Sequence, residues 1–527
     1  MASQDISAKM PSDLLSHLPD IPLDIILQHL DLASFTNLRL TSRQLSTNTI
    51  SSRFFRCSKT DLSLDSLRSL RERATHLQLG PLLRELTVVA TLYDPHPAEA
   101  TVQTRKKWSE FDKNDLQHGR GNYRQRLENL RRRNVDCTDE ELQEAQRDLD
   151  WIQTRVQLDT NTNVGQVTDL LSAVLKSATN LRAINLDACI IAGRAKTCRP
   201  AEHCEWYRSE EHVSNWPSVW TAASQTFRIV TSAISSSRIE LESFHVFPNT
   251  PLCSVQLRHI EGHVKRLDLD GFAAACKNIK SLGLSFSSRK RIDGALPYQG
   301  GRLFRDAFGA HAPFQVFGSK AEDFTGATTI LGCMTNITSL NFHLHHLDCP
   351  LLPEYAKVFS HISQNMRLGR LRELPLRGLP LRPDDIVLFL TNHPTITKLS
   401  LEGILLVGRS WSSVFSCIKA MPTLESLYLS SLSTQNHRYG ITSLDPVNRT
   451  VEFGPQHREQ WVTWGDGHVL HTLSMCREEI QQGLDFRSLQ VPLTRCGKDM
   501  WAYMDRVECE FGPPSGIWEW DPLSDDM

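Results

Sequence analysis

The chain has no long apolar segment and no marked excess of charge of either sign. No apolar run approaches the roughly 20 residues that a membrane-spanning helix requires. The 58 Lys and Arg residues nearly balance the 60 Asp and Glu residues, which gives a formal net charge of -2. A chain this close to neutral is not expected to bind nucleic acid or an anionic membrane through its overall charge. The sequence therefore predicts no membrane partner and no nucleic-acid partner.

A secretory signal and a disulfide framework are also absent from the pattern. The first residues, MASQDISAKMPSD, lack a basic start followed by an apolar core, so we expect no secretory leader. The 13 cysteines show no repeated spacing, which favours reduced and mostly buried thiols. Together these features predict a cytoplasmic or nuclear protein, or one found in both compartments.

No familiar catalytic motif occurs. The chain lacks a G-x-S-x-G elbow, an H-E-x-x-H pair, a Walker loop and a dinucleotide fingerprint. Two groups of residues have the chemistry of metal ligands, but neither matches a zinc template in its spacing. We therefore predict no catalytic residue, no metal and no cofactor. The two groups are Cys189, Cys198, His203, Cys204 and His212, and His343, His345, His346 and Cys349.

The middle of the chain repeats a short pattern, apolar-x-x-apolar-x-apolar. Its last two apolar positions alternate as they do in a half-buried strand. Most copies follow an apolar helical stretch and a break, and Pro394 and Pro422 are expected to stop two of these helices. The copies are Leu83/Leu86/Val88, Leu181/Ile184/Leu186, Leu241/Phe244/Val246, Val264/Leu267/Leu269, Ile279/Leu282/Leu284, Ile337/Leu340/Phe342, Leu371/Leu374/Leu376, Ile396/Leu399/Leu401 and Leu424/Leu427/Leu429.

A helix–strand unit cannot bury its apolar face alone, whereas stacked copies can. From Leu376 to Leu401 is 25 residues and from Leu401 to Leu429 is 28, which fits a repeat that contains a helix. The array resembles an irregular leucine-rich repeat, although the Asn or Cys of that consensus is not kept. The expected fold class is α/β, with a solenoid of alternating helices and parallel strands. The alternative is a generic α/β domain built from the same alternation.

The N-terminal segment 18–57 is predicted to form three short helices. Pro22 suits the first turn of a helix, and Leu23, Ile26, Leu27 and Leu30 follow on one apolar face. Ser34 is a candidate cap for the second helix. About 40 residues with apolar side chains on several faces cannot bury them all, so we expect the segment to dock against a partner or another domain.

This segment resembles the F-box. The family opens with Leu-Pro-x-Glu-Ile, which stands here as Ile21-Pro22-Leu23-Asp24-Ile25. Later family positions correspond to Phe35, Leu38, Leu40, Ser42, Arg43, Leu45 and Phe54. The following LRELTV strand is similar to that of many fungal F-box proteins. The resemblance covers only this short segment, and an N-terminal three-helix cap on the next domain is the alternative.

The F-box resemblance implies a helical domain that binds the Skp-type adaptor of a cullin-based ubiquitin ligase. On that reading a set of residues lies at or near the adaptor surface. They are Pro22, Leu23, Asp24, Ile25, Leu30, Leu38 and Leu40.

Two further segments complete the expected organisation. In 104–157, Thr138 and Glu141 form a capping-box pair that begins an amphipathic helix, expected to lie on the repeat domain or to bind a partner. From 435 onward the chain is rich in tryptophan and is expected to fold back on the body, with a disordered end. The predicted divisions are an F-box at 18–57, a linker helix and first strand unit at 58–103, a charged helical insertion at 104–157, a leucine-rich-repeat-like domain at 158–434 and a C-terminal extension at 435–527.

The function that these resemblances imply is recognition without catalysis. The chain would be the substrate-recognition subunit of an SCF-type ubiquitin ligase. The F-box would bind the adaptor, and through it a cullin, while the repeat domain would bind an unidentified protein substrate. The alternative is a repeat-based interaction scaffold with no ligase link.

Overall fold

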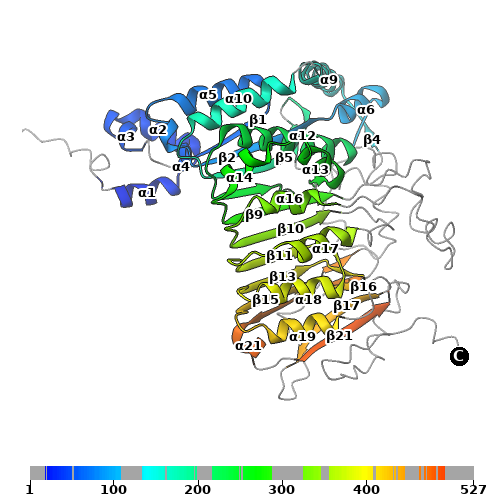
Figure 1. Ribbon diagram of the computed structural model, residues 1–527. Coiled ribbons are helices and arrows are strands. Elements are labelled where there is room, and N and C mark those ends of the chain that lie inside the picture. Colours follow the sequence, from blue (N-terminus) through cyan, green and yellow to red (C-terminus); the bar gives the residue numbers. More distant parts are fainter. Residues whose placement is uncertain are drawn as a thin grey trace, which may run out of the picture.

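The structure is a computed structural model with an α/β architecture. It contains one large, mostly parallel sheet whose successive parallel strands are joined through helices. Figure 1 shows the strands stacked along the length of the molecule, with the N-terminal helices at one end. Within the described part, no helix is long and apolar enough to cross a bilayer. The structure describes residues 18, 20–49, 53–108, 133–160, 163–194, 196–198, 216–248, 250, 253–287, 324–345, 355–407, 411–430, 432–434, 437–444, 462–464, 468–470, 472–481 and 485–492.

The strands of the large sheet pair in the order in which they occur along the chain. Every neighbouring pair on this path is parallel except the last, in which β20 runs antiparallel to β15. Off the path, β6 (Lys196–Cys198) pairs with β5 and β8 (Val255–Gln256) pairs with β9. The path is β1 (Cys57–Asp61), β2 (Glu85–Tyr93), β5 (Ala183–Gly193), β7 (Ser243–Val246), β9 (Ser281–Ser287), β10 (Ser339–His345), β11 (Glu373–Arg377), β13 (Lys398–Glu402), β15 (Ser426–Ser430) and β20 (Thr472–Cys476).

Helices cover one face of this sheet, and successive helices pack against one another, as α17 does with α18 and α18 with α19. Figure 1 shows α16, α17, α18 and α19 one beneath another in front of the strands. Helices α18 and α19 end at Asn392 and Ala420, just before Pro394 and Pro422, as the sequence predicts. The helices are α5 (Leu64–Thr75), α10 (Val164–Ser177), α12 (Trp216–Ser237), α13 (Leu257–Val264), α14 (Leu269–Cys276), α16 (Gly326–Gly332), α17 (Ala356–Asn365), α18 (Pro383–Asn392), α19 (Ser412–Ala420) and α21 (Arg477–Gln481).

The repeated apolar pattern marks a strand at every copy but one. At each correct copy the three apolar side chains are at most 2% exposed and belong to one continuous core. The exception is Val264/Leu267/Leu269, which joins α13 to α14. There Asp268 caps α14, because its Oδ1 accepts a hydrogen bond from the Gly271 N–H at 3.1 Å. The prediction of a strand at this copy is therefore wrong, since a helix cap overrides the apolar alternation.

Strand β1 is present in the structure, although the apolar pattern does not predict it. Its two inward side chains, Ser58 and Thr60, are polar yet only 6% exposed. Arg73 Nη1 donates to Ser58 Oγ at 2.9 Å, and Thr60 Oγ1 donates to the Asp61 carbonyl at 3.0 Å. Hydrogen bonds thus replace apolar contacts at this end of the sheet, and a rule based on apolar alternation overlooks the strand.

In the later repeats each long strand turns into a short second strand. Gly378 and Gly403 follow β11 and β13 with φ of 62° and 61°, a conformation that favours glycine. The short strands β12 (Pro380–Leu381), β14 (Leu405–Leu406) and β16 (Ser433–Thr434) pair in parallel. They begin a second sheet that continues through β17 (His437–Leu444) and β21 (Asp485–Pro492). These repeats therefore contribute strands to two sheets, and Leu381 and Leu406 of the short strands belong to the large core.

The charged insertion packs on the array through its helix α9 (Asp139–Thr160). The predicted capping box is confirmed, because the Thr138 N–H donates to Glu141 Oε2 at 3.0 Å and the Glu141 N–H to Thr138 Oγ1 at 3.3 Å. Asp148 is 2% exposed and accepts from the backbone N and the Nε of Arg194, which follows β5. The seam residue Val156 is 39% exposed. The insertion also contains β4 (Arg133–Asp136), which pairs with β3 (Lys106–Trp108) after α6 (His96–Thr104).

The C-terminal region contributes β17 to β21, including the hairpin of β18 (Val462–Trp464) and β19 (His468–Leu470). Strand β20 pairs with β15, so part of this region does return to the body. Of the tryptophans on which the prediction rested, Trp461, Trp501, Trp518 and Trp520 lie outside the described residues, as does the side chain of Trp464.

A buried histidine makes the array sensitive to acid. His263 Nε2 lies 2.7 Å from Thr231 Oγ1, and burial lowers the pKa of this histidine from 6.5 to about 4. The unfolded chain therefore takes up a proton near pH 6.5, whereas the folded chain does so only near pH 4. Stability is complete above pH 6.5 and falls as the pH drops through that window. Between pH 7.5 and 5 we expect a loss of about 2 kcal/mol from this group.

The measurement is the urea midpoint at both pH values for the native chain and for His263→Gln. The variant should lose clearly less stability than the native chain on acidification. His245, His259 and His393, whose pKa values are also lowered by burial, account for a remaining dependence in both proteins. If the urea midpoint of His263→Gln falls between the two pH values by as much as that of the native chain, His263 is not the source of the acid sensitivity.

Candidate functional site

The N-terminal helices form a small unit with a core of its own. They are α1 (Asp20–Gln28), α2 (Leu32–Thr41), α3 (Arg43–Asn48) and α4 (Arg53–Arg56). Leu23, Leu27, Phe35 and Leu45 are each 2% exposed and form a cluster distinct from the large core of the array. Figure 1 shows α1, α2 and α3 beside the stack of strands, at the end where α4 leads into β1. The unit is therefore joined to the array at one end.

Local capping explains how so short a segment holds helices. Asp31 Oδ1 accepts from the Ser34 N–H at 2.7 Å, and this hydrogen bond lowers the pKa of Asp31. Asp31, not Ser34 as the sequence suggested, is thus the cap of α2. Ser42 caps α3. Arg39 joins the helices, because its guanidinium lies 4.8 Å from the Phe55 ring centroid and donates to the Ser46 carbonyl at 3.3 Å.

The unit leaves apolar side chains on its surface. Ile25 is 53% exposed, Ile26 is 37% exposed and Leu40 is 80% exposed. Pro22 is also exposed. On α1, residues 22 and 25 lie on the side away from the buried Leu23 and Leu27, and residue 26 lies at the border between the two sides, because side chains repeat every 3.6 residues. Large apolar groups of this exposure on so small a unit are typical of a surface that a partner covers.

The structure divides the residues that the sequence assigned to the adaptor surface. Pro22, Ile25 and Leu40 are exposed, as an interface requires. Leu23 is 2% exposed and packs in the small core that holds the helices together. Leu30 and Leu38 are half-buried against the same cluster. The side chain of Asp24 lies outside the described residues. Sequence reasoning missed Ile26, which it placed on the inward stripe.

The sheet face opposite the helices carries a second concentration of polar groups. Asn185 Nδ2 donates to Glu85 Oε1 at 2.6 Å, and His245 Nε2 lies 3.3 Å from Ser281 Oγ. The His245 imidazole packs directly over Gly283. A Cβ at position 283 would lie only 2.8 Å from His245 Nδ1. Burial lowers the pKa of His245, although the charge of Glu85 opposes the shift. The neutral ring can therefore donate and accept hydrogen bonds near neutral pH.

Next to this group, a lysine and an aspartate pair across three strands. Lys59 Nζ lies 2.8 Å from Asp187 Oδ2, and Thr250 Oγ1 donates to Asp187 Oδ1 at 2.6 Å. Burial raises the pKa of Asp187, but the hydrogen bonds from Lys59 and Thr250 outweigh it and lower the pKa overall. Further along the face, Lys398 pairs with Glu373 at 2.7 Å. Charges on this face thus largely neutralise one another.

The groups with metal-ligand chemistry fall mainly on undescribed positions. The side chain of Cys198, and His203, Cys204 and His212, lie outside the described residues, while Cys189 is half-buried on β5. In the second group only His343 is described with its side chain. Among the described residues, no three His, Cys, Asp or Glu side chains gather as a metal site would require.

Comparison with known proteins adds no assignment. No protein-family model matches the chain, and no curated protein matches it in sequence.

Proposed function

We propose that the chain is the substrate-recognition subunit of an SCF-type ubiquitin ligase. In this proposal residues 18–57 are an F-box that binds a Skp-type adaptor, and through it a cullin. The array is an irregular leucine-rich-repeat-like solenoid that holds a protein substrate. The chain contributes position, and other subunits carry out the ubiquitin transfer.

One observation carries the adaptor proposal. The N-terminal unit has its own four-residue core and still leaves Ile25 and Leu40 53% and 80% exposed. A simple cap on the array would instead turn its apolar side chains toward the large core, to which none of the buried residues of the unit belongs. Burial of such side chains against a partner helix would supply affinity at about 25 cal/mol per Å² of apolar surface.

The solenoid part of the proposal rests on strand order. The strands pair in chain order, each repeat contributes a strand to one sheet and a helix to one face, and the last repeats add a second short strand. A doubly wound α/β domain would instead reverse its strand order near the middle of the sheet. Pairing with nearest neighbours is typical of repeat proteins. The polar open face, with Glu85, Asn185 and His245, supports this surface as the place for a substrate.

The decisive test is co-expression of the chain with a Skp-type adaptor. We expect a complex that survives size-exclusion chromatography. Deletion of residues 1–49 should abolish it without unfolding the array, because the two cores are separate. If the full chain does not bind the adaptor, or if the deletion variant still binds it, the proposal is overturned. The alternative is then an interaction scaffold with no ligase link.

A further inference from the structure

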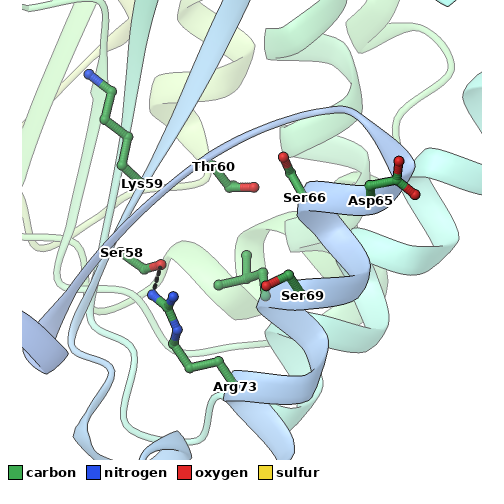
Figure 2. Close-up of a pocket in the computed structure, with 8 residues that line it drawn as sticks. Ser58, Lys59, Thr60, Asp65, Ser66, Ser69 and Arg73 are labelled. Atoms are coloured by element: carbon green, nitrogen blue, oxygen red, sulfur yellow. Dashed lines mark hydrogen bonds between the residues drawn. The ribbon is translucent and has the colours of Figure 1, made fainter. Parts of the chain in front are cut away.

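A polar groove lies between the first strand of the sheet and the first helix of the array. Figure 2 shows it between β1 and α5, with the hydrogen bond from Arg73 to Ser58 at one end. Its volume is about 330 Å³. The lining is rich in hydroxyl groups and also carries three charged residues. Its members are Ser58, Lys59, Thr60, Asp65, Ser66, Ser69, Leu70 and Arg73.

The groove runs beside an unpaired strand edge. In the described part of the chain, β1 pairs only with β2. The Arg56 carbonyl faces β2, because it accepts from the Arg84 N–H at 2.8 Å. Backbone groups of successive strand residues point to opposite edges, so those of Cys57 and Lys59 face away from β2. Free N–H and C=O groups of this kind are a template for an added strand.

The charged residues that line the groove differ in whether they form an ion pair. Lys59 pairs with Asp187 at 2.8 Å. Arg73 hydrogen bonds to Ser58 and forms no ion pair with any described residue. The nearby acids are engaged elsewhere, because Asp65 pairs with Arg68 at 3.1 Å and Asp61 accepts from the Ser63 hydroxyl at 2.7 Å. An incoming anion would thus meet a guanidinium and several hydroxyl donors.

We propose that this groove binds an extended peptide of another protein, which adds to β1 as a further strand and places an anionic side chain against Arg73. Side chains of a strand alternate between faces, so every second side chain of the added strand would lie on the α5 side of the sheet. A carboxylate and a phosphoryl group share the required chemistry, since both form charge-assisted hydrogen bonds with a guanidinium. The site goes beyond adaptor binding and does not depend on it.

The test uses the full chain without adaptor and fluorescent peptides about eight residues long, the length of an ordinary strand. The peptides alternate Thr and Gln and carry Glu, phosphoserine, Gln or Lys at the centre. Fluorescence polarisation should show that Glu and phosphoserine peptides bind at least about tenfold more tightly than the Lys peptide. N-methylation of alternate peptide nitrogens should abolish binding in one register and leave it unchanged in the other.

Arg73→Ala should remove the preference for the anionic peptides. Arg71→Ala is the matched control, because Arg71 is an exposed arginine on the same helix that does not line the groove. Equal binding of the Glu and Lys peptides, or an unchanged preference in folded Arg73→Ala, would overturn the charge part of the proposal. Equal effects of N-methylation in both registers would overturn strand addition. Adaptor binding is measured on the same protein preparations. A loss of peptide binding with adaptor binding unchanged then concerns the groove alone.

Discussion

Replacing Ile25 and Leu40 together by aspartate is expected to abolish adaptor binding while leaving the chain folded. Both side chains already contact water in the free protein, at 53% and 80% exposure, so the substitution removes little packing. In a complex the same positions would be buried, and each would lose about 1.5 kcal/mol or more of apolar burial and would bury a carboxylate as well. We expect affinity to fall at least about a hundredfold. Isothermal titration calorimetry with purified adaptor measures it.

Two further variants separate the surface from the fold. Leu77 is 93% exposed and lies beyond α5, so Leu77→Asp should leave adaptor affinity unchanged. Leu27 is 2% exposed within the small core, so Leu27→Asp should unfold the helical unit and reduce helical circular dichroism. If the Ile25/Leu40 double variant binds the adaptor as the native chain does, the exposed apolar side chains of this unit are not the interface.

Gly378→Ala is expected to destabilise the array far more than Gly403→Ala, although both glycines occupy the same turn in successive repeats. Their φ angles are 62° and 61°, so a side chain strains the backbone by about 1 kcal/mol at either position. Only at Gly378 would the new Cβ also meet a neighbouring strand, 2.3 Å from the Leu344 carbonyl oxygen. At Gly403 the nearest atom is 3.7 Å away.

Relief of that clash requires β10 and β11 to separate locally, because both contacting groups are backbone. We expect a total cost of about 3 kcal/mol or more at Gly378 against about 1 kcal/mol at Gly403. Urea denaturation followed by tryptophan fluorescence measures both. Gly403→Ala is the internal control for conformational strain, and equal midpoints for the two variants would show that the close approach of the repeats at Gly378 is not as tight as described.

Apolar patterning predicted the strands well because a strand buried on one face by helices must carry apolar residues at alternate positions. Leu399 and Leu401 of β13 are an example, at 2% and 0% exposure. The same reasoning failed at β1, where Ser58 and Thr60 are buried through hydrogen bonds. It also failed at Leu269, where the Asp268 cap begins a helix. An apolar pattern predicts which residues are buried. It does not predict whether a buried segment is a strand or a helix where local hydrogen bonds, such as the Asp268 cap, decide the conformation.

The candidate surfaces were harder to predict than the fold. The apolar pattern of residues 18–57 predicted N-terminal helices, but it could not tell that Leu23 faces inward and that Ile26 is partly exposed. That distinction depends on how the helices are rotated in the packed unit. The polar group of Glu85, Asn185 and His245 was beyond the sequence altogether, since its members come from three repeats and meet only through strand register.

The agreement between strand order and chain order has a consequence for biosynthesis. As the polypeptide leaves the ribosome, each strand finds its partner already made, so the array can grow vectorially without waiting for distant segments. Strand β20 is the exception in this sheet. It follows β17 in the chain but pairs with the earlier strand β15, in the antiparallel direction. A nascent chain halted before residue 472 would thus carry an open-ended sheet, a natural target for chaperones.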